Sequence, residues 1–190
     1  MVYRLHLVRH GQATHSPNHD ITIPDPPLTE MSTQQSIKLN EDFPYHRNVG
    51  LMITSPLRRT LQTAIIGFST CLNGGTARLS LEPEIQAHSS RPCDTCSTVE
   101  CLQIEFPDLP WSELDLGGIY PAKEGIYATD VESLEKRGRR AQGLLLREFK
   151  RLEGTGREDI VVASHGGFLG HISGHHNTWK YFSNILCYLH

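Results

Sequence analysis

Short runs of apolar residues, each bounded by polar residues or by glycine, recur along the chain and predict strands. Such runs occur at Tyr3–Val8, at Leu51–Ser55, within Ala77–Ile85 and at Asp159–Ser164. Runs of this kind are typical of strands that are buried in a parallel sheet. The hydrophobic pattern therefore predicts a parallel sheet at the centre of the fold.

Between these runs, apolar residues recur at the spacing of amphipathic helices. The helical segments are Thr29–Leu39, where Thr29 is the expected N-terminal cap, Leu57–Phe68 and Val131–Leu152. Strands that alternate with helices are typical of layered α/β folds. We therefore expect an α/β protein, a three-layer α/β/α sandwich in which a mostly parallel central sheet lies between helices.

The segment 86–127 differs from its surroundings, because it is rich in proline, glycine, serine and cysteine and contains only one short helical candidate, Val99–Phe106. Long connections of this kind within a domain are typically functional. We expect this segment to form an inserted lid or substrate loop rather than a second domain. The 190 residues are then predicted to form one domain, covering residues 1–190.

Composition narrows the range of partners. The formal net charge of −3 provides no global basic field, which argues against nucleic acid or an anionic membrane as the main partner. No apolar run approaches the roughly 20 residues that span a bilayer, and the first residues show no signal-peptide pattern. A cytoplasmic location is therefore expected, while the sequence leaves the oligomeric state open.

The five cysteines are an odd number, which argues against a secreted disulfide scaffold. Cys93 and Cys96, with Cys101 nearby, permit a zinc or redox interpretation, but the spacing lacks a second cysteine pair, and His88 is only a candidate for a fourth ligand. Reduced thiols are the favoured interpretation. No metal and no cofactor are therefore expected.

The basic segment Glu135–Arg151 has two interpretations. It offers lysines and arginines to a phosphate-rich partner, but its leucines recur at helical spacing with the charges on the other face. A solvated amphipathic helix is therefore the favoured interpretation.

Polar clusters follow three of the predicted strands, at Arg9–Gly11, Ser55–Arg59 and Ser164–Gly167. Ligands of open parallel sheets bind beyond the carboxyl ends of the strands, so these clusters are expected to converge on one pocket. Two histidines and one or more arginines in one crevice indicate an anion site. Gly166 and Gly167 allow a close approach of the backbone and begin a helix, whose N-terminus favours an anion.

The stretches "LVRHGQAT", "SPLRRTLQTA" and "VVASHGGFL", in this order and at these spacings, resemble the histidine phosphatase superfamily in its phosphoglycerate mutase-like branch. The looser "LTEMSTQQS", "PEIQAHSSRPCDT" and "AKEGIYATDVESLEKRGRRAQGLL" are similar to a fungal-type phosphoglycerate mutase-like group. The resemblance covers nearly the whole chain. It implies a phosphoglycerate mutase-like fold and a phosphatase that acts on a small phosphorylated metabolite through a phosphohistidine intermediate.

The resemblance implies catalytic roles for four side chains. His10 matches the nucleophile that accepts the phosphoryl group, and Arg9 lies beside it. Arg59 matches the arginine of the S-x-L-x-R pattern, and His165 matches the second histidine. These four residues are the predicted catalytic set.

Four further residues are substrate-binding candidates. Gly11 and Gly166 match glycines that keep the backbone close to the phosphate. Ser16 stands where the family often places an asparagine, so one neutral phosphate contact is weaker or made differently. Arg58 occupies the variable place of the S-x-L-x-R pattern, which is typical of an exposed helix residue.

Phosphoryl transfer independently requires groups of these types. The transferred group spreads negative charge over three oxygens, which fixed donors must stabilise. Arg9 and Arg59 supply permanently charged guanidinium groups, and His165, if protonated, adds a third cationic donor. A neutral imidazole at His10 is a competent nucleophile near neutral pH. No metal is needed for this chemistry.

The proton-donating half of the site departs from the family pattern. The resemblance implies a carboxylate that protonates the leaving oxygen, and alignment puts Ala87 in its place. A positioned general acid contributes on the order of 100- to 10,000-fold to a rate. Glu84, His88 and Asp94 are nearby candidates that could replace it.

An alanine at position 87 is also compatible with two further hypotheses. In the first, the substrate carries a leaving group that needs little protonation, such as an acyl phosphate, a phosphoanhydride or an acidic enol or phenol. In the second, the chain is a non-phosphatase descendant of the fold, either a tailoring lyase or hydrolase of a biosynthetic pathway or an inactive anion-binding protein. The presence of all four catalytic candidates favours phosphate chemistry, whereas the alanine at the expected acid position favours a non-phosphatase descendant of the fold.

Overall fold

A five-stranded parallel sheet forms the centre of the protein. The computed structural model describes residues 3–114, 120–173 and 185–188. The spatial order of the strands is β3 (Arg78–Leu81), β2 (Val49–Thr54), β4 (Asp159–Ser164), β1 (Leu5–Arg9) and β5 (Ile185–Tyr188), and every neighbouring pair is parallel. The predicted α/β class and the parallel sheet are confirmed. The edge strand β5 is an addition that the hydrophobic pattern does not predict.

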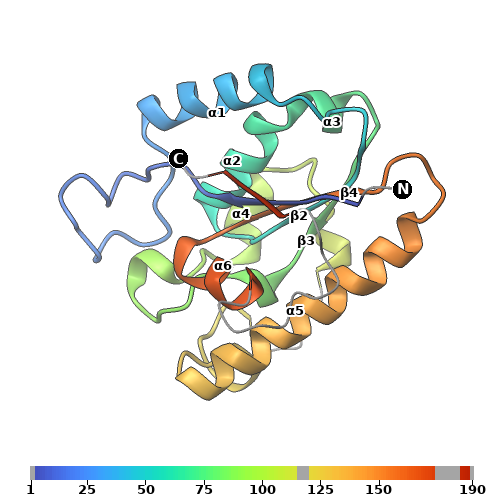
Figure 1. The fold of residues 1–190 in the computed structure, drawn as a ribbon. Coiled ribbons are helices and arrows are strands. Elements are labelled where there is room, and N and C mark those ends of the chain that lie inside the picture. Colours follow the sequence, from blue (N-terminus) through green and yellow to red (C-terminus); the bar gives the residue numbers. More distant parts are fainter. Residues whose placement is uncertain (1–2, 115–119, 174–184, 189–190) are drawn as a thin grey trace.

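Helices cover both faces of the sheet (Figure 1). They are α1 (Glu30–Asp42), α2 (Arg58–Gly67), α3 (Ser69–Asn73), α4 (Val99–Glu105), α5 (Val131–Leu152) and α6 (Gly166–Ser173). Four short 3₁₀ helices lie in the described connections: η1 (Pro83–Ile85), η2 (Pro92–Asp94), η3 (Trp111–Glu113) and η4 (Gly125–Tyr127). Figure 1 shows α1, α2 and α3 on one side of the sheet and α5 and α6 on the other, which confirms the three-layer sandwich.

The strands divide their apolar side chains between two cores. In β4, Ile160 and Val162 face the core beneath α5 and α6, whereas Val161 and Ala163 face the core beneath α1, α2 and α3. All residues of β4 are buried. A strand that helices cover on both faces has no solvent side, which explains why its sequence is an uninterrupted apolar run.

The helices begin at the residues that their caps indicate. The side chain of Thr29 accepts a hydrogen bond from the backbone of Ser32 at the start of α1, and Asp130 accepts one from Ser133 at the start of α5. The predicted helix over residues 57–68 is divided in the structure, because the chain turns at Phe68 between α2 and α3. The predicted helices over residues 29–39 and 99–106 differ from α1 and α4 by at most three residues at either end.

Helix α5 has the predicted bounds, but the expectation that its charged side chains are solvated is wrong at two positions. Arg137 is fully buried, and Glu148 is buried as well. The guanidinium of Arg137 donates to the backbone oxygen of Gln86 and lies 4.3 Å from the centre of the Phe168 ring. Backbone acceptors thus satisfy Nη2 and an aromatic face lies against this cation, whereas its Nε and Nη1 are buried without a hydrogen-bond partner among the described residues.

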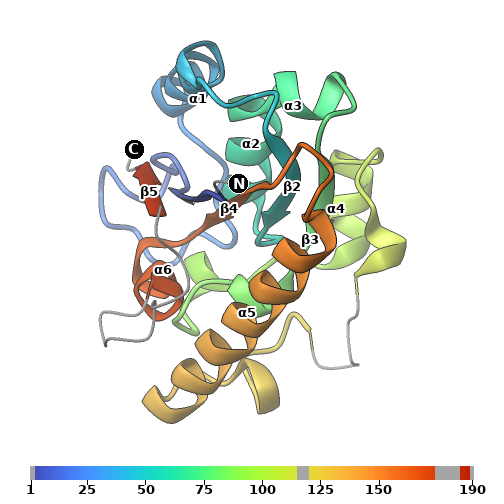
Figure 2. The ribbon, with the colours of Figure 1, turned by 45° about the vertical axis from the view of Figure 1, so that its right-hand side comes forward.

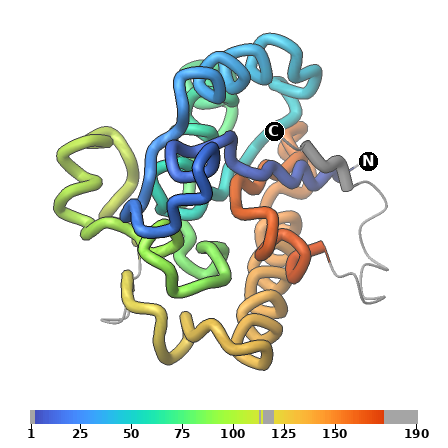
Figure 3. The backbone as a smooth tube through the Cα atoms, turned by 90° about the vertical axis from the view of Figure 1, so that its left-hand side faces the viewer, coloured from blue at the N-terminus to red at the C-terminus, as the bar shows by residue number. Residues whose placement is uncertain are grey.

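The described part of segment 86–127 packs against the N-terminal end of α2. Leu57 and Leu61 share a buried cluster with Ala87 and Leu102. The loop that follows β1 lies against this segment, since the backbone N–H of Cys93 donates to the oxygen of Ile21 (Figure 3). The lid function of the segment stays a prediction, but its first half is held in place by neighbouring elements on two sides.

The parallel register brings three strand ends to one edge of the sheet. Arg9 at the end of β1 pairs with Ser164 at the end of β4, and Thr54 at the end of β2 pairs with Ala163. Figure 2 shows β2 and β4 running in the same direction toward the segments that follow them. The three polar clusters therefore emerge side by side.

Candidate active site

Three of the predicted side chains meet at this edge. His10 follows β1 directly, Arg59 lies in the first turn of α2 just after β2, and His165 lies between β4 and α6. Their exposed fractions are 8%, 1% and 3%, so all three are buried. The backbone N–H of His10 donates to the oxygen of Ser164, which extends the sheet pairing into the site.

The imidazole of His10 is held in one orientation. Its Nδ1 lies 2.7 Å from the backbone oxygen of Gly11, and a carbonyl oxygen can only accept, so Nδ1 carries the proton. The lone pair of Nε2 is left to accept a hydrogen bond of 3.1 Å from Nε of Arg59. Burial, and after it the charge of Arg59, lowers the pKa of His10 to about 3. His10 is therefore neutral at neutral pH, with its Nε2 lone pair facing the guanidinium.

The guanidinium of Arg59 joins the elements of the site. Its Nη1 donates to the backbone oxygen of Cys93 at 2.6 Å, and its Nη2 donates to Oδ1 of Asp94 at 2.9 Å. The same Nη2 lies 3.0 Å from Nδ1 of His165. Asp94 is itself fixed, because its Oδ2 accepts a hydrogen bond from the hydroxyl of Ser89 at 2.6 Å. Arg59 thus links the strand ends to η2.

His165 is also neutral in this structure, so it does not supply the third cationic donor that a protonated imidazole would add. Its Nδ1 accepts the hydrogen bond from Arg59, and its Nε2 lies 3.0 Å from the hydroxyl of Ser55. Burial, followed by the charge of Arg59, lowers the pKa of His165 well below its ordinary value. The centres of the His10 and His165 rings are 5.0 Å apart, so two neutral imidazoles flank one buried guanidinium.

Glycines at the site permit close packing. A Cβ atom on Gly11 would lie 2.9 Å from the side chain of Ser32, and its backbone N–H donates to the hydroxyl of Thr63 at 3.1 Å. A Cβ atom on Gly166 would lie 3.2 Å from Cδ of Arg9. Arg9, which is exposed, therefore extends across the start of α6 toward the rim of the site.

The structure separates the candidates for the missing acid. Ala87 is buried, with an exposed fraction of 1%. Glu84 is ion-paired with Arg140 and lines a hollow of about 730 Å³ between η1, η4 and α5, which His10, Arg59 and His165 do not line. Glu84 is therefore not brought to the site.

Two other candidates lie beside the site. The exposed ring of His88 lies against the backbone at Gly167, where a Cβ atom would approach it to 2.3 Å. The carboxylate of Asp94 is engaged by Arg59 and Ser89. Both are near the three buried side chains, but neither occupies position 87.

Arg58 and Ser16 are held by contacts outside the group of three buried side chains. The guanidinium of Arg58 donates to Glu105 at 2.6 Å and to the backbone oxygen of Asp25 at 2.9 Å, which fixes it against α4 and the loop after β1. Ser16 closes a turn through a backbone hydrogen bond to Ala13. Neither contact involves His10 or Arg59.

Two residues near the site carry no signal in the sequence. His15 lies in the loop after β1. Burial, followed by the charge of the nearby Arg59, lowers the pKa of His15, while the charge of Asp94 acts in the opposite direction. Lys123 reaches the site from the bend before η4 and donates to the backbone oxygen of Ala87 at 2.9 Å. Lys123 lies in one of the looser matching stretches and His15 directly follows the first motif, but neither is a candidate from the sequence, and only the folded arrangement identifies them.

The cysteine cluster does not form a metal site. Cys93 and Cys96 are buried free thiols, Cys101 is exposed, and the thiol of Cys96 donates to the backbone oxygen of Pro56. In the part of the chain that the structure describes, no group of three histidine, cysteine, aspartate or glutamate side chains could hold a metal ion. Within those same residues, no helix combines the length and apolar character needed to cross a membrane.

Comparisons with known proteins agree with this geometry. The family profile of the histidine phosphatase superfamily (branch 1) matches residues 5–181. A probable phosphatase of Schizosaccharomyces pombe is 27% identical over 138 residues, which cover 71% of this chain and 64% of that protein. Phosphoglycerate mutase-like protein 1 of Arabidopsis thaliana is 26% identical over an alignment of 206 positions, covering 88% of this chain and 69% of that protein. The chain thus spans less than two thirds of the fission yeast relative.

A solved structure shows the same fold. Mycobacterial glucosyl-3-phosphoglycerate phosphatase superposes with a TM-score of 0.53 at 17% identity, covering 88% of this chain and 76% of that protein. At this identity the likeness concerns the architecture, and it places the polar strand ends in a fold that a phosphatase also uses.

We expect acid to destabilise the protein partly through His10. The pKa of His10 is about 3 in the folded chain, against about 6.5 for an unfolded histidine. Between these values only the unfolded chain binds the proton. Above pH 6.5 neither state binds this proton, and the free energy of unfolding does not change with pH through His10. As the pH falls from 6.5 toward about 3, protonation of the unfolded chain lowers the free energy of unfolding by up to about 1.4 kcal/mol per pH unit.

The variant His10→Asn removes this difference in proton binding and is expected to flatten the decrease, as measured by urea denaturation between neutral pH and about pH 4. His19→Asn is the matched control, because His19 is exposed and has a φ of 53° that asparagine tolerates. An unchanged slope in His10→Asn would contradict the neutral, buried imidazole.

Proposed function

The chain belongs to the histidine phosphatase superfamily, and from this membership we propose that it is a phosphomonoesterase acting on a small phosphorylated metabolite through a phosphohistidine at His10. The observation that carries the proposal is the orientation of His10. Its proton is fixed on Nδ1 by Gly11, so Nε2 presents a lone pair beside a buried guanidinium. The phosphatase name of the fission yeast relative supports hydrolysis of phosphate esters as the reaction class.

Nε2 of His10 is the proposed attacking atom. As the bond from phosphorus to the leaving oxygen breaks, charge spreads over three phosphoryl oxygens. In this structure the N–H groups of Arg59 donate to His10, Asp94 and His165. When substrate binds, phosphoryl oxygens take the place of these acceptors, and Arg59 stabilises their charge. Water then attacks the phosphohistidine, and the electron pair of the P–N bond returns to Nε2.

The remaining candidates have supporting roles in this proposal. Arg9, at the rim, and the N-terminus of α6, beginning at Gly166, offer positive charge and backbone N–H groups to the phosphate. The carbonyl oxygen of Gly11 accepts a hydrogen bond from Nδ1 of His10, and the backbone N–H of Gly11 donates to the hydroxyl of Thr63. His165 is proposed as a neutral donor and acceptor that keeps Arg59 in position.

A second function is favoured by one observation. Position 87 carries a buried alanine, and the carboxylates of Glu84 and Asp94 are committed to Arg140 and Arg59. A descendant that binds a phosphorylated or carboxylated anion without hydrolysing it would need the guanidinium of Arg59 but not an acid. The two functions differ in whether His10 becomes phosphorylated.

Phosphorylation of His10 is the decisive measurement. The protein is incubated with an aryl phosphate that has an acidic leaving group, and its intact mass is recorded after rapid quenching at alkaline pH, which preserves phosphohistidine. We expect an adduct of one phosphoryl group in the wild type, located on His10 by fragmentation, and none in His10→Ala. Absence of the adduct together with absence of turnover would overturn the phosphatase and leave the anion-binding protein.

We also expect Arg59→Lys to lower kcat/KM for the aryl phosphate by about 100- to 1,000-fold, because a lysine cannot contact both imidazoles and η2 at once. Arg139→Lys is the matched control, since Arg139 lies on the exposed surface of α5 and pairs with Glu135. Activity is expected to change by less than about threefold in the control. Equal losses in the two variants would contradict the assignment of Arg59.

A further inference from the structure

Lys123 reaches the position at which the family pattern has an acid. It lies in the bend before η4, and its Nζ donates to the backbone oxygen of Ala87 at 2.9 Å. The residue is half-buried and retains some contact with solvent. The alanine therefore carries no proton donor of its own, but an ammonium group stands next to it.

Lys123 also lies within electrostatic reach of the reacting groups. Its charge contributes to the lowered pKa of His165, and the charges of Arg59 and Asp94 in turn act on Lys123. An ammonium carries three N–H groups, of which the hydrogen bond to Ala87 uses one. The group is thus anchored at position 87 while it retains further protons.

We propose that Lys123 is the general acid of this protein, donating to the leaving-group oxygen the proton that a carboxylic acid at position 87 would otherwise supply. This inference rests on the proposed phosphatase function. It assigns a catalytic role to a residue outside the three strand-end motifs.

The chemical environment of Lys123 suits a proton donor. Burial, followed by the charge of Arg137, lowers the pKa of Lys123 to about 7. Asp94 and Cys96 shift this pKa in the opposite direction. General acids work best when their pKa lies near the operating pH. An exposed lysine, with a pKa of about 10.4, would hold its proton too strongly.

The neighbouring candidates are less suitable donors. Arg137 contacts the same carbonyl oxygen, but even the lowered pKa of Arg137, about 10, keeps this guanidinium protonated at neutral pH. The carboxylate of Asp94 is already engaged, because it accepts hydrogen bonds from Arg59 and Ser89. Lys123 is half-buried, is hydrogen-bonded at position 87 and has a proton that it can donate near neutral pH.

The proposed step is balanced in protons and electrons. Nε2 of His10 forms a bond to phosphorus while the bond from phosphorus to the leaving oxygen breaks. The leaving oxygen takes a proton from Nζ of Lys123 and departs as an alcohol, and the amine becomes neutral. In the second step the neutral amine accepts a proton from the attacking water as the P–N bond breaks, which restores the ammonium and frees His10.

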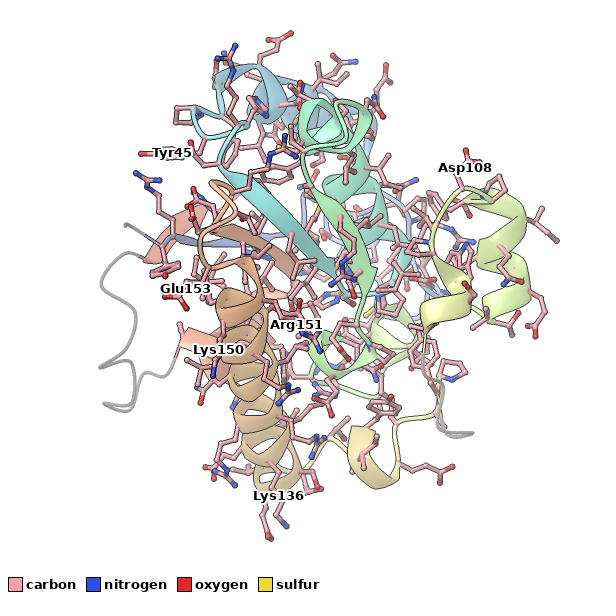
Figure 4. All side chains as sticks on the ribbon, turned by 90° about the vertical axis from the view of Figure 1, so that its right-hand side faces the viewer. Tyr45, Asp108, Lys136, Lys150, Arg151 and Glu153 are labelled. Carbon is pink, nitrogen blue, oxygen red and sulfur yellow. The ribbon has the colours of Figure 1, made fainter. Side chains whose placement is uncertain are left out.

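The test compares three variants on two substrates. Lys123→Met removes the charge and the proton, Lys123→Arg keeps the charge but holds its proton at neutral pH, and Ala87→Glu restores a carboxyl group. The substrates are an alkyl phosphate, whose leaving oxygen needs a proton, and an aryl phosphate with an acidic leaving group. Lys136→Met is the matched control, because Lys136 projects from α5 and pairs with Glu132 on the surface (Figure 4).

We expect Lys123→Met and Lys123→Arg to lower kcat/KM for the alkyl phosphate by about 100- to 10,000-fold. For the aryl phosphate we expect changes of less than about tenfold, which also shows that both variants are folded. Introducing Ala87→Glu into Lys123→Met is expected to restore turnover of the alkyl phosphate. The control Lys136→Met is expected to behave as the wild type with both substrates.

The pH profile provides an independent measurement. In the wild type, kcat/KM for the alkyl phosphate is expected to fall above pH about 7, because Lys123 loses the proton it must donate. The groups that face Lys123 are Arg137 from α5, Asp94 and Cys96 from the segment around η2, Arg59 from α2 and His165 after β4. This alkaline decrease is expected to be absent with the aryl phosphate.

Three results would overturn the inference. Full activity of Lys123→Arg on the alkyl phosphate would show that only the charge is needed, and unchanged activity of Lys123→Met would show that neither charge nor proton is needed. Failure of the wild type to turn over the alkyl phosphate, while it forms an adduct with the aryl phosphate, would exclude any general acid and leave the phosphatase function intact. Absence of the adduct from the wild type would instead overturn both proposals.

Discussion

The guanidinium of Arg59 between two imidazoles is the interaction on which the arrangement of the site depends. It donates to Nε2 of His10, to Nδ1 of His165 and to the carboxylate of Asp94, and it is almost completely buried. A permanent cation at this place adds to the effect of burial and disfavours protonation of both histidines. The same interaction therefore fixes the orientation and the protonation state of the proposed nucleophile. Without it, Nδ1 of His165 would lose its hydrogen-bond donor, whereas the carbonyl of Gly11 would still hold the proton of His10 on Nδ1.

The position of Arg59 follows from the sheet. Parallel strands place their carboxyl ends at one edge, and the register of β1, β4 and β2 aligns the residues that follow them. Helix α2 begins four residues after β2 ends, so its first turn carries Arg59 over the end of β4. The backbone oxygen of Cys93 in η2 then completes the coordination of the guanidinium from the opposite side. Two cores, one on each face of the sheet, hold these elements at fixed distances.

The sequence predicts the architecture and the convergence of His10, Arg59 and His165, because apolar runs that end in polar residues at strand ends are a local signal. It does not predict protonation states or contacts that depend on burial. His165 is neutral because tertiary packing removes water from it, and Arg137 is buried because Gln86 and Phe168 replace its solvent. Lys123 reaches Ala87 across 36 positions of the sequence, which no periodicity reveals.

The alanine at position 87 and the state of Lys123 are physically connected. A carboxylate within a few ångströms of an ammonium stabilises its charged form and raises its pKa. With alanine at position 87, burial and the nearby Arg137 act on Lys123 without such a partner there, and its pKa is about 7. A glutamate at this place would pair with the ammonium, so the lysine would retain its proton. An alanine at position 87, which has no proton to donate, thus provides the electrostatic conditions under which Lys123 can donate one.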